Sequence, residues 1–142
     1  MEIRRAKLDD ASPIAGLMEE LGYSVAGESI RTKLAMIRDS TDDAVLVAVV
    51  DQRLVGCISL HAMLMFHVEG KLGRITSLVV TSNVRSQGVG EALLDAAHRW
   101  FELAGCTKFE VTSGDQRARA HTFYESHGYC RGGQRFSREA GQ

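Results

Sequence analysis

The chain has few cysteines, and those it has form no recognisable pattern. Cys57, Cys106 and Cys130 are an odd number without metal-ligand spacing, and each lies in an apolar stretch. At 142 residues, the chain is long enough to bury a core without a disulfide staple. We therefore expect three buried free thiols, as in a protein of a reducing compartment, and no metal site.

Excess charge, aromatic residues and long apolar runs are also scarce. Seventeen Lys and Arg against eighteen Asp and Glu leave a net charge of -1, and aromatic content is 6%. This balance argues against a nucleic-acid-binding protein that neutralises phosphates, although it leaves room for a local basic patch. The N-terminus has no apolar signal region, and no later stretch is long enough to span a bilayer. We therefore expect a cytoplasmic protein with no membrane or nucleic-acid partner.

The spacing of apolar residues predicts an α/β chain. The expected elements, in order, are a strand at 3–6, a helix from 12 to 22, a helix at 30–37, strands at 44–50, 54–68 and 73–80, a helix from 86 to 105, a strand at 108–112, a helix at 117–127 and a final strand at 130–137. The three middle strands are expected to pair as an antiparallel meander. The long helix should then return the chain as a parallel crossover.

A glycine-containing turn opens the longest predicted helix. Apolar Leu78-Val79-Val80 leads into Arg85-Ser86-Gln87-Gly88-Val89-Gly90. Helix N-termini offer unpaired N–H groups and partial positive charge, so this turn is a candidate phosphate site, with Arg85 as a further donor. A Gly-x-Gly pair alone more often reflects turn geometry. The turn lacks the third glycine of a dinucleotide fingerprint and the Gly-Lys-Ser/Thr of a nucleoside triphosphate loop.

Two sequence motifs that follow one another in the expected order make the evidence for a phosphate site at this turn more specific. Residues 79–94 resemble the acetyl-CoA motif of the GNAT N-acetyltransferase superfamily, and Ala120-His121-Thr122-Phe123-Tyr124-Glu125-Ser126-His127-Gly128-Tyr129 resembles its second motif. The resemblance implies one N-acetyltransferase domain over 1–142, with a mixed central sheet, helices on both faces and the order β-α-α-β-β-β-α-β-α-β. It also implies acetyl-CoA as co-substrate.

The resemblance assigns roles residue by residue. Tyr124 would face the coenzyme sulfur and protonate the leaving thiolate, with helix packing as the alternative. The strand backbone would contact the acetyl and pantetheine groups, and the turn would hold the pyrophosphate. The cofactor-binding residues expected in this way are Leu78, Val79, Val80, Arg85, Ser86, Gln87, Gly88, Val89, Gly90, Arg117 and Tyr124.

Some positions depart from the family pattern. Arg117 stands where many members carry Asn, and Thr76 and Ser77 stand where many carry an acidic base. Hydroxyls cannot take a proton at neutral pH, so the base is expected at His67 or Glu69, or in solvent; a surface histidine is the alternative for His67.

A second histidine, His61, lies on the same predicted strand as His67. An unbulged strand would direct both to one face, roughly 20 Å apart, too far to share a metal ion. The segments 56–80 and 123–136 also resemble, in part, aminoalkylphosphonate N-acetyltransferases, which points to a small amine.

The sequence therefore predicts an acetyl-CoA-dependent N-acetyltransferase in which a neutral primary amine of a small molecule attacks the thioester directly in a ternary complex. A protein amino group or an aminoacyl-tRNA is an alternative acceptor. A non-catalytic CoA-binding regulatory module is the alternative outside the enzymes, and Tyr124 favours an enzyme. A homodimer is one possible assembly.

Overall fold

The computed structural model describes residues 1–85, 87–112 and 118–141. The chain forms two compact units, Met1–Val111 and Thr112–Gln142. Two residues of the predicted cofactor-binding site, Ser86 and Arg117, lie outside these described residues. No helix within the described ranges combines the length and apolar character needed to cross a membrane.

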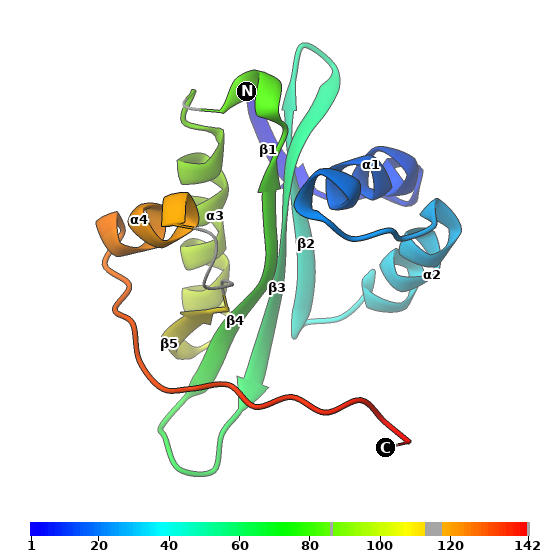
Figure 1. Cartoon of the computed structure of the whole chain (residues 1–142). Coiled ribbons are helices and arrows are strands. Elements are labelled where there is room, and N and C mark those ends of the chain that lie inside the picture. The colour runs from blue at the N-terminus through cyan, green and yellow to red at the C-terminus, as the bar shows by residue number, and fades with distance from the viewer. Residues whose placement is uncertain (86, 113–117, 142) are drawn as a thin grey trace. The chain divides into compact units, whose positions relative to one another are not determined.

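The first unit is built on a five-stranded sheet (Figure 1). Its strands lie side by side in chain order: β1 (Glu2–Arg5), β2 (Asp43–Val50), β3 (Arg53–Leu64), β4 (Lys71–Val80) and β5 (Cys106–Val111). The first four pair antiparallel, and β5 pairs parallel to β4. This arrangement confirms the predicted meander and the parallel return.

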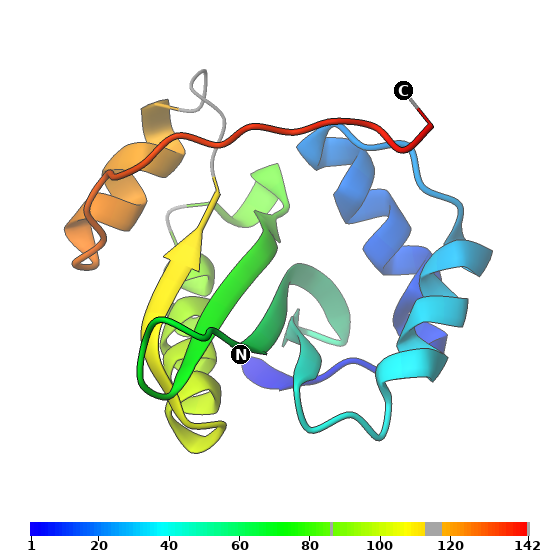
Figure 2. The same cartoon turned by 90° about the horizontal axis from the view of Figure 1, so that it is seen from below.

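Helices cover both faces of this sheet (Figures 1 and 2). After the short turn η1 (Leu8–Asp10), α1 (Ala11–Leu21) and α2 (Gly27–Ile37) lie on one face. The turn η2 (Ser82–Val84) leads to α3 (Val89–Leu103), which lies on the opposite face. The predicted fold class is confirmed. The second unit contains α4 (Ala118–Ser126).

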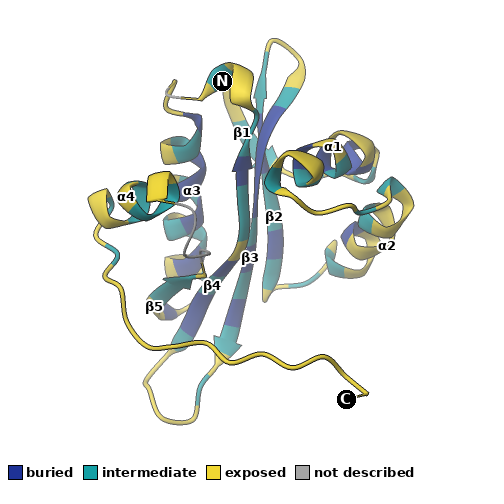
Figure 3. Cartoon of the chain, in the orientation of Figure 1, coloured by how far each residue is buried: buried dark blue, intermediate teal, exposed yellow. Residues whose placement is uncertain are grey.

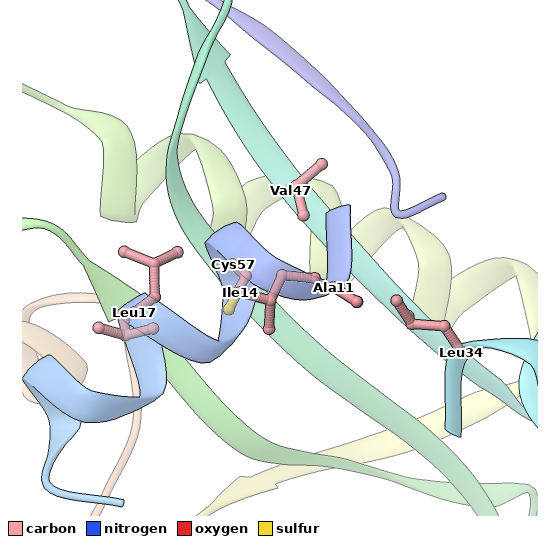
Figure 4. Close-up of a cluster of buried hydrophobic side chains, with 7 residues drawn as sticks. Ala11, Ile14, Leu17, Leu34, Val47 and Cys57 are labelled. Carbon is pink, nitrogen blue, oxygen red and sulfur yellow. The ribbon is translucent and has the colours of Figure 1, made fainter. Parts of the chain in front are cut away.

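The buried residues of the first unit lie on the strands and on the helices that cover them (Figure 3). Gly56 and Gly73 face α3, because an added Cβ would meet Leu93 and Phe101 of that helix. By strand alternation, fully buried Ile58, Leu60 and Ile75 share this face. The Phe101 ring lies so close to Gly73 that an added Cβ would come within 2.6 Å of it. On the other face, α1 and α2 pack on buried residues of β2, β3 and β4 (Figure 4); the cluster comprises Ala11, Ile14, Leu17, Leu34, Val47, Cys57 and Val79.

A β-bulge interrupts the pairing of β3 with β4. Ser59 pairs with Ser77, but Leu60 pairs with Ile75, so Thr76 is the extra residue of β4. In a regular strand, Ile75 and Ser77 would share a face because side chains alternate. The bulge instead turns Ile75 towards α3 and Ser77 towards the face of α1 and α2, since Leu60 and Ser59 face opposite ways.

Three expectations are wrong. Residues 130–137 form no strand: the described residues 130–141 are all exposed, and this stretch combines charged side chains with Gly132-Gly133 instead of alternating apolar residues. Cys130 is accordingly exposed, whereas Cys57 and Cys106 are buried, and all three are free. The predicted strand at 54–68 ends at Leu64, before the turn that contains exposed Phe66.

Candidate active site

The predicted phosphate turn leads directly into α3. Gly88, the N-cap of this helix, has a φ of 80°, a left-handed conformation that favours glycine. The N–H groups of the first helical turn, from Val89 onward, have no partner within the helix. The N–H groups of Arg85 and Gln87 donate to carbonyls of η2, at 3.5 and 3.3 Å. The donors best placed for an anion are therefore those at the start of α3.

The side chains of Arg85 and Glu20 form hydrogen bonds that connect this turn to its neighbours. Arg85 is exposed, and its Nε donates to the carbonyl of Val80, the last residue of β4, at 3.3 Å. Glu20, near the end of α1, accepts from the Thr81 hydroxyl at 2.8 Å and from the Ser82 N–H at 3.1 Å. The turn is thus tied to β4 and to α1.

Strand β4 continues beyond its pairing with β5. The last matched pair of the two strands is Ile75 with Val111, whereas β4 extends to Val80. On the other edge, Leu78 and Val80 remain paired with Ile58 and Gly56 of β3. Along residues 76–80, the described part of β5 therefore leaves one edge of β4 without a strand partner. A ligand with its own hydrogen-bonding groups could use this edge.

Tyr124 belongs to the second unit. It is half-buried on α4, and its ring meets those of Phe123 and Tyr129 edge-on, with centroids 5.4 and 5.7 Å apart. Burial, with a smaller effect of Tyr124, raises the pKa of Tyr129 to about 12. The predicted role of Tyr124 towards the coenzyme sulfur stays a prediction.

The two predicted base candidates lie on the turn between β3 and β4. His67 and Glu69 are both exposed, and the Thr107 hydroxyl donates to the Glu69 carbonyl at 2.6 Å. The prediction that His61 and His67 share one face of a strand is wrong, because β3 ends at Leu64. Their assignment as bases stays a prediction.

The sequence interpretation missed a polar cluster on the face of α1 and α2. His61 Nδ1 lies 2.8 Å from Asp43 Oδ1, and His61 Nε2 lies 2.8 Å from the Thr76 hydroxyl. The Ser59 hydroxyl lies 2.7 Å from that of Thr76 and 2.6 Å from that of Ser77. The hydrogen bond with His61 is the main reason that the pKa of Asp43 is lowered. Strand register, which pairs Asp43 with His61 and Ser59 with Ser77, is the signal that could have revealed it.

Known proteins resemble this chain over most of its length. Residues 15–129 match the acetyltransferase (GNAT) family. The chain is 29% identical over 138 residues to an aminoalkylphosphonate N-acetyltransferase of Salmonella typhimurium. The aligned residues cover 96% of this chain and 90% of that protein.

Solved structures share the fold. A glucosamine-6-phosphate N-acetyltransferase from Arabidopsis thaliana has a TM-score of 0.85 at 21% identity, covering 98% of this chain and 97% of that one. The aminoglycoside N-acetyltransferase AAC(6')-Iy, in complex with CoA, has a TM-score of 0.85 at 17% identity, covering 98% and 94%. At these identities, the likeness establishes the fold. Since the family match covers most of the chain, the protein belongs to the GNAT acetyltransferase family and is an N-acetyltransferase.

Proposed function

We propose that the whole chain acts as one acetyl-CoA-dependent N-acetyltransferase domain, which transfers the acetyl group to the primary amine of a small molecule. The amine attacks the thioester directly, in a ternary complex. The observation that carries this proposal is the end of β4–β5 pairing at Ile75, followed along the chain by the unpaired N–H groups at the start of α3. An open strand edge and an anion site suit the two ends of a coenzyme that carries a pyrophosphate.

The roles follow from these positions. The first turn of α3 and Arg85 bind the pyrophosphate, and the backbone of Leu78, Val79 and Val80 binds the pantetheine arm. A backbone N–H of this strand stabilises the oxyanion that forms when the amine attacks. Tyr124 then gives its proton to the leaving thiolate, since a phenol with a pKa near 10 can protonate a thiolate whose pKa is about 8.5.

A small acceptor is favoured over a nucleic acid by charge. The net charge is -1, and the sequence has no run of Lys and Arg that could follow a phosphate backbone. The Salmonella relative, by its name, acetylates aminoalkylphosphonates. Aminoalkylphosphonates are therefore the first amines to test.

The experiment is a release assay for the free thiol of CoA. The purified protein is incubated with acetyl-CoA and a panel of aminoalkylphosphonates, amino acids and polyamines, and products are identified by mass. We expect amine-dependent thiol release with one class of small amine. Acetylation of charged tRNA or protein alone would contradict the proposed acceptor. Binding of CoA without turnover of any acceptor would instead indicate a regulatory module.

A further inference from the structure

The polar cluster is a continuous chain of hydrogen bonds across three strands. It runs from Asp43 on β2 through His61 on β3, Thr76 on β4 and Ser59 on β3 to Ser77 on β4, and every link is between 2.6 and 2.8 Å long. Such distances are those of well-formed hydrogen bonds. We call Thr76, Ser59 and Ser77 the hydroxyl chain.

The bulge makes the hydroxyl chain possible. Neighbouring residues of a regular strand point to opposite faces, so Thr76 and Ser77 could not both reach one partner. Here both contact the Ser59 hydroxyl, because Thr76 is the extra residue of β4. Ser77 also lies just past Ile75, at the point where β4 loses its pairing with β5. The hydroxyl chain therefore ends beside the strand edge proposed for the thioester.

The direction of each hydrogen bond follows from the carboxylate. Ionised Asp43 can only accept, so a neutral His61 carries its proton on Nδ1 and accepts at Nε2. Thr76 must then donate to Nε2. Since each hydroxyl has one proton, Ser59 donates to Thr76 and Ser77 donates to Ser59. The lone pairs of the Ser77 oxygen are left to accept from an outside donor.

We propose that His61 is the proton acceptor for the substrate ammonium, reached through the hydroxyl chain, and that Asp43 positions its ring. This inference rests on the proposed function and names the base that the hydroxyl residues Thr76 and Ser77 cannot themselves supply. Ser77 is the member expected to touch the amine, and His61 acts through it.

The proton transfer balances at each atom. One N–H bond of the ammonium breaks as an O–H bond forms on Ser77, and the former Ser77 proton passes to Ser59. The Ser59 proton passes to Thr76, and the Thr76 proton passes to Nε2 of His61. The product is a neutral amine and an imidazolium bonded to Asp43, with every hydrogen bond of the hydroxyl chain reversed. The His61 side chain is 34% exposed, so it can return this proton to water.

The charged neighbours of His61 have hydrogen-bonding or ion-pair partners away from its ring. On β4, Arg74 lies opposite His61 and forms an ion pair with Glu110 of β5 at 3.5 Å. At the start of β4, Lys71 binds Asp42, the residue before β2, at 3.0 Å. From β1, the Arg5 guanidinium donates to the Asp43 carbonyl at 2.8 Å. Asp43 is the acidic group in direct contact with the ring.

The first test measures kcat/KM against pH with acetyl-CoA and aminomethylphosphonate. Thr76→Val keeps the shape of the side chain but breaks the proton path, and His61→Gln removes its end. We expect each to lower kcat/KM about 10²-fold at pH 7, the lower end for general base catalysis. The loss should shrink as pH rises towards the pKa of a primary alkylamine, about 10.4 for a lysine side chain, because the amine then loses its proton without help.

Controls separate this effect from a loss of structure. Thr76→Ser restores the hydroxyl and should restore the rate. Thr107→Val makes the same substitution at another exposed strand threonine and should leave the profile unchanged. Equal losses at every pH for Thr76→Val, or unchanged rates in both Thr76→Val and His61→Gln, would overturn the inference while the proposed function stands.

The second test needs no acceptor. Nitrogen NMR of protein labelled with ¹⁵N-histidine distinguishes the two neutral tautomers of His61, assigned with His61→Gln. The direction of the hydroxyl chain requires the Nδ1–H form, and the Nε2–H form would overturn the inference whatever the activity. If the wild type does not acetylate aminomethylphosphonate, the proposed use of aminoalkylphosphonates fails and the tautomer alone decides the inference.

Discussion

At the scale of single residues, Asp10 is the one buried charged side chain of the described chain. Its carboxylate accepts from both terminal nitrogens of Arg4, at 2.7 and 3.0 Å, and from the Lys7 N–H at 2.7 Å. The hydrogen bond with Arg4 is the main reason that the pKa of Asp10 is lowered, against the opposing effect of burial. This contact ties β1 to the start of α1.

Replacing Asp10 with Asn should lower the free energy of unfolding at pH 7 by about 2 kcal/mol, the range for hydrogen bonds to charged groups. Because folding lowers the pKa of Asp10, its stabilisation is present above the ordinary value of 3.8 and is lost as pH falls through the folded-state value. Urea unfolding should therefore show the two proteins converging below pH 3.8. Asp9→Asn is the control: the Asp9 side chain is 97% exposed, and its loss should change little.

Tyr124→Phe tests the proposed acid. We expect CoA affinity to stay nearly intact and turnover to fall roughly 10²-fold, because the ring remains and only the hydroxyl group, with its transferable proton, is lost. Tyr129→Phe removes a hydroxyl from the tyrosine that meets Tyr124 edge-on and should have a small effect. Steady-state kinetics with the best amine of the panel would decide. A loss of less than about threefold would leave Tyr124 as a packing residue only.

At the scale of elements, the two ends of α3 offer a matched pair of glycines. Gly88 begins the helix with a φ of 80°, Gly105 follows it with a φ of 88°, and an added Cβ would meet nothing within 4 Å at either position. A valine at either site therefore brings backbone strain without a clash.

Only one of these two valines should affect the cofactor. We expect Gly88→Val and Gly105→Val to lower the melting temperature alike, but only Gly88→Val to weaken acetyl-CoA binding, by about tenfold or more. Calorimetry on the two folded variants measures the dissociation constant of acetyl-CoA for each. Equal affinities in the two variants would contradict a pyrophosphate site at the start of α3.

Most elements could be predicted because their signals are local. The helix after Gly88 and the strands of the meander follow from glycine positions and apolar spacing, and they form close to the expected bounds except for β3, which ends at Leu64. The strand expected at 130–137 does not form, because this stretch has charged side chains and Gly132-Gly133 in place of alternating apolar residues. Local signals could not reveal the polar cluster: His61 and Thr76 are 15 residues apart and meet only through strand register and a bulge.

At the scale of the whole molecule, the two faces of the sheet differ in polarity. The face towards α3 holds fully buried apolar residues such as Ile58 and Ile75. The other face is apolar where α1 and α2 pack, at residues such as Val47, Cys57 and Val79, and becomes polar further along the same strands. Tyr124, to which the proposed function gives the role of the acid, belongs to the second compact unit. The spacing of apolar residues predicts the α/β fold but does not reveal which polar side chains share a face of the sheet.

The bulge at Thr76 has a consequence for insertions and deletions. Removing this single residue should leave Ser77 opposite Ser59 and Ile75 opposite Leu60, so the ladder becomes regular without any change of partner. We expect such a deletion variant to melt no lower than the wild type, yet to acetylate amines at pH 7 as slowly as Thr76→Val. A proton path would then have been gained or lost in this fold by changing the length of one strand, with every remaining side chain kept.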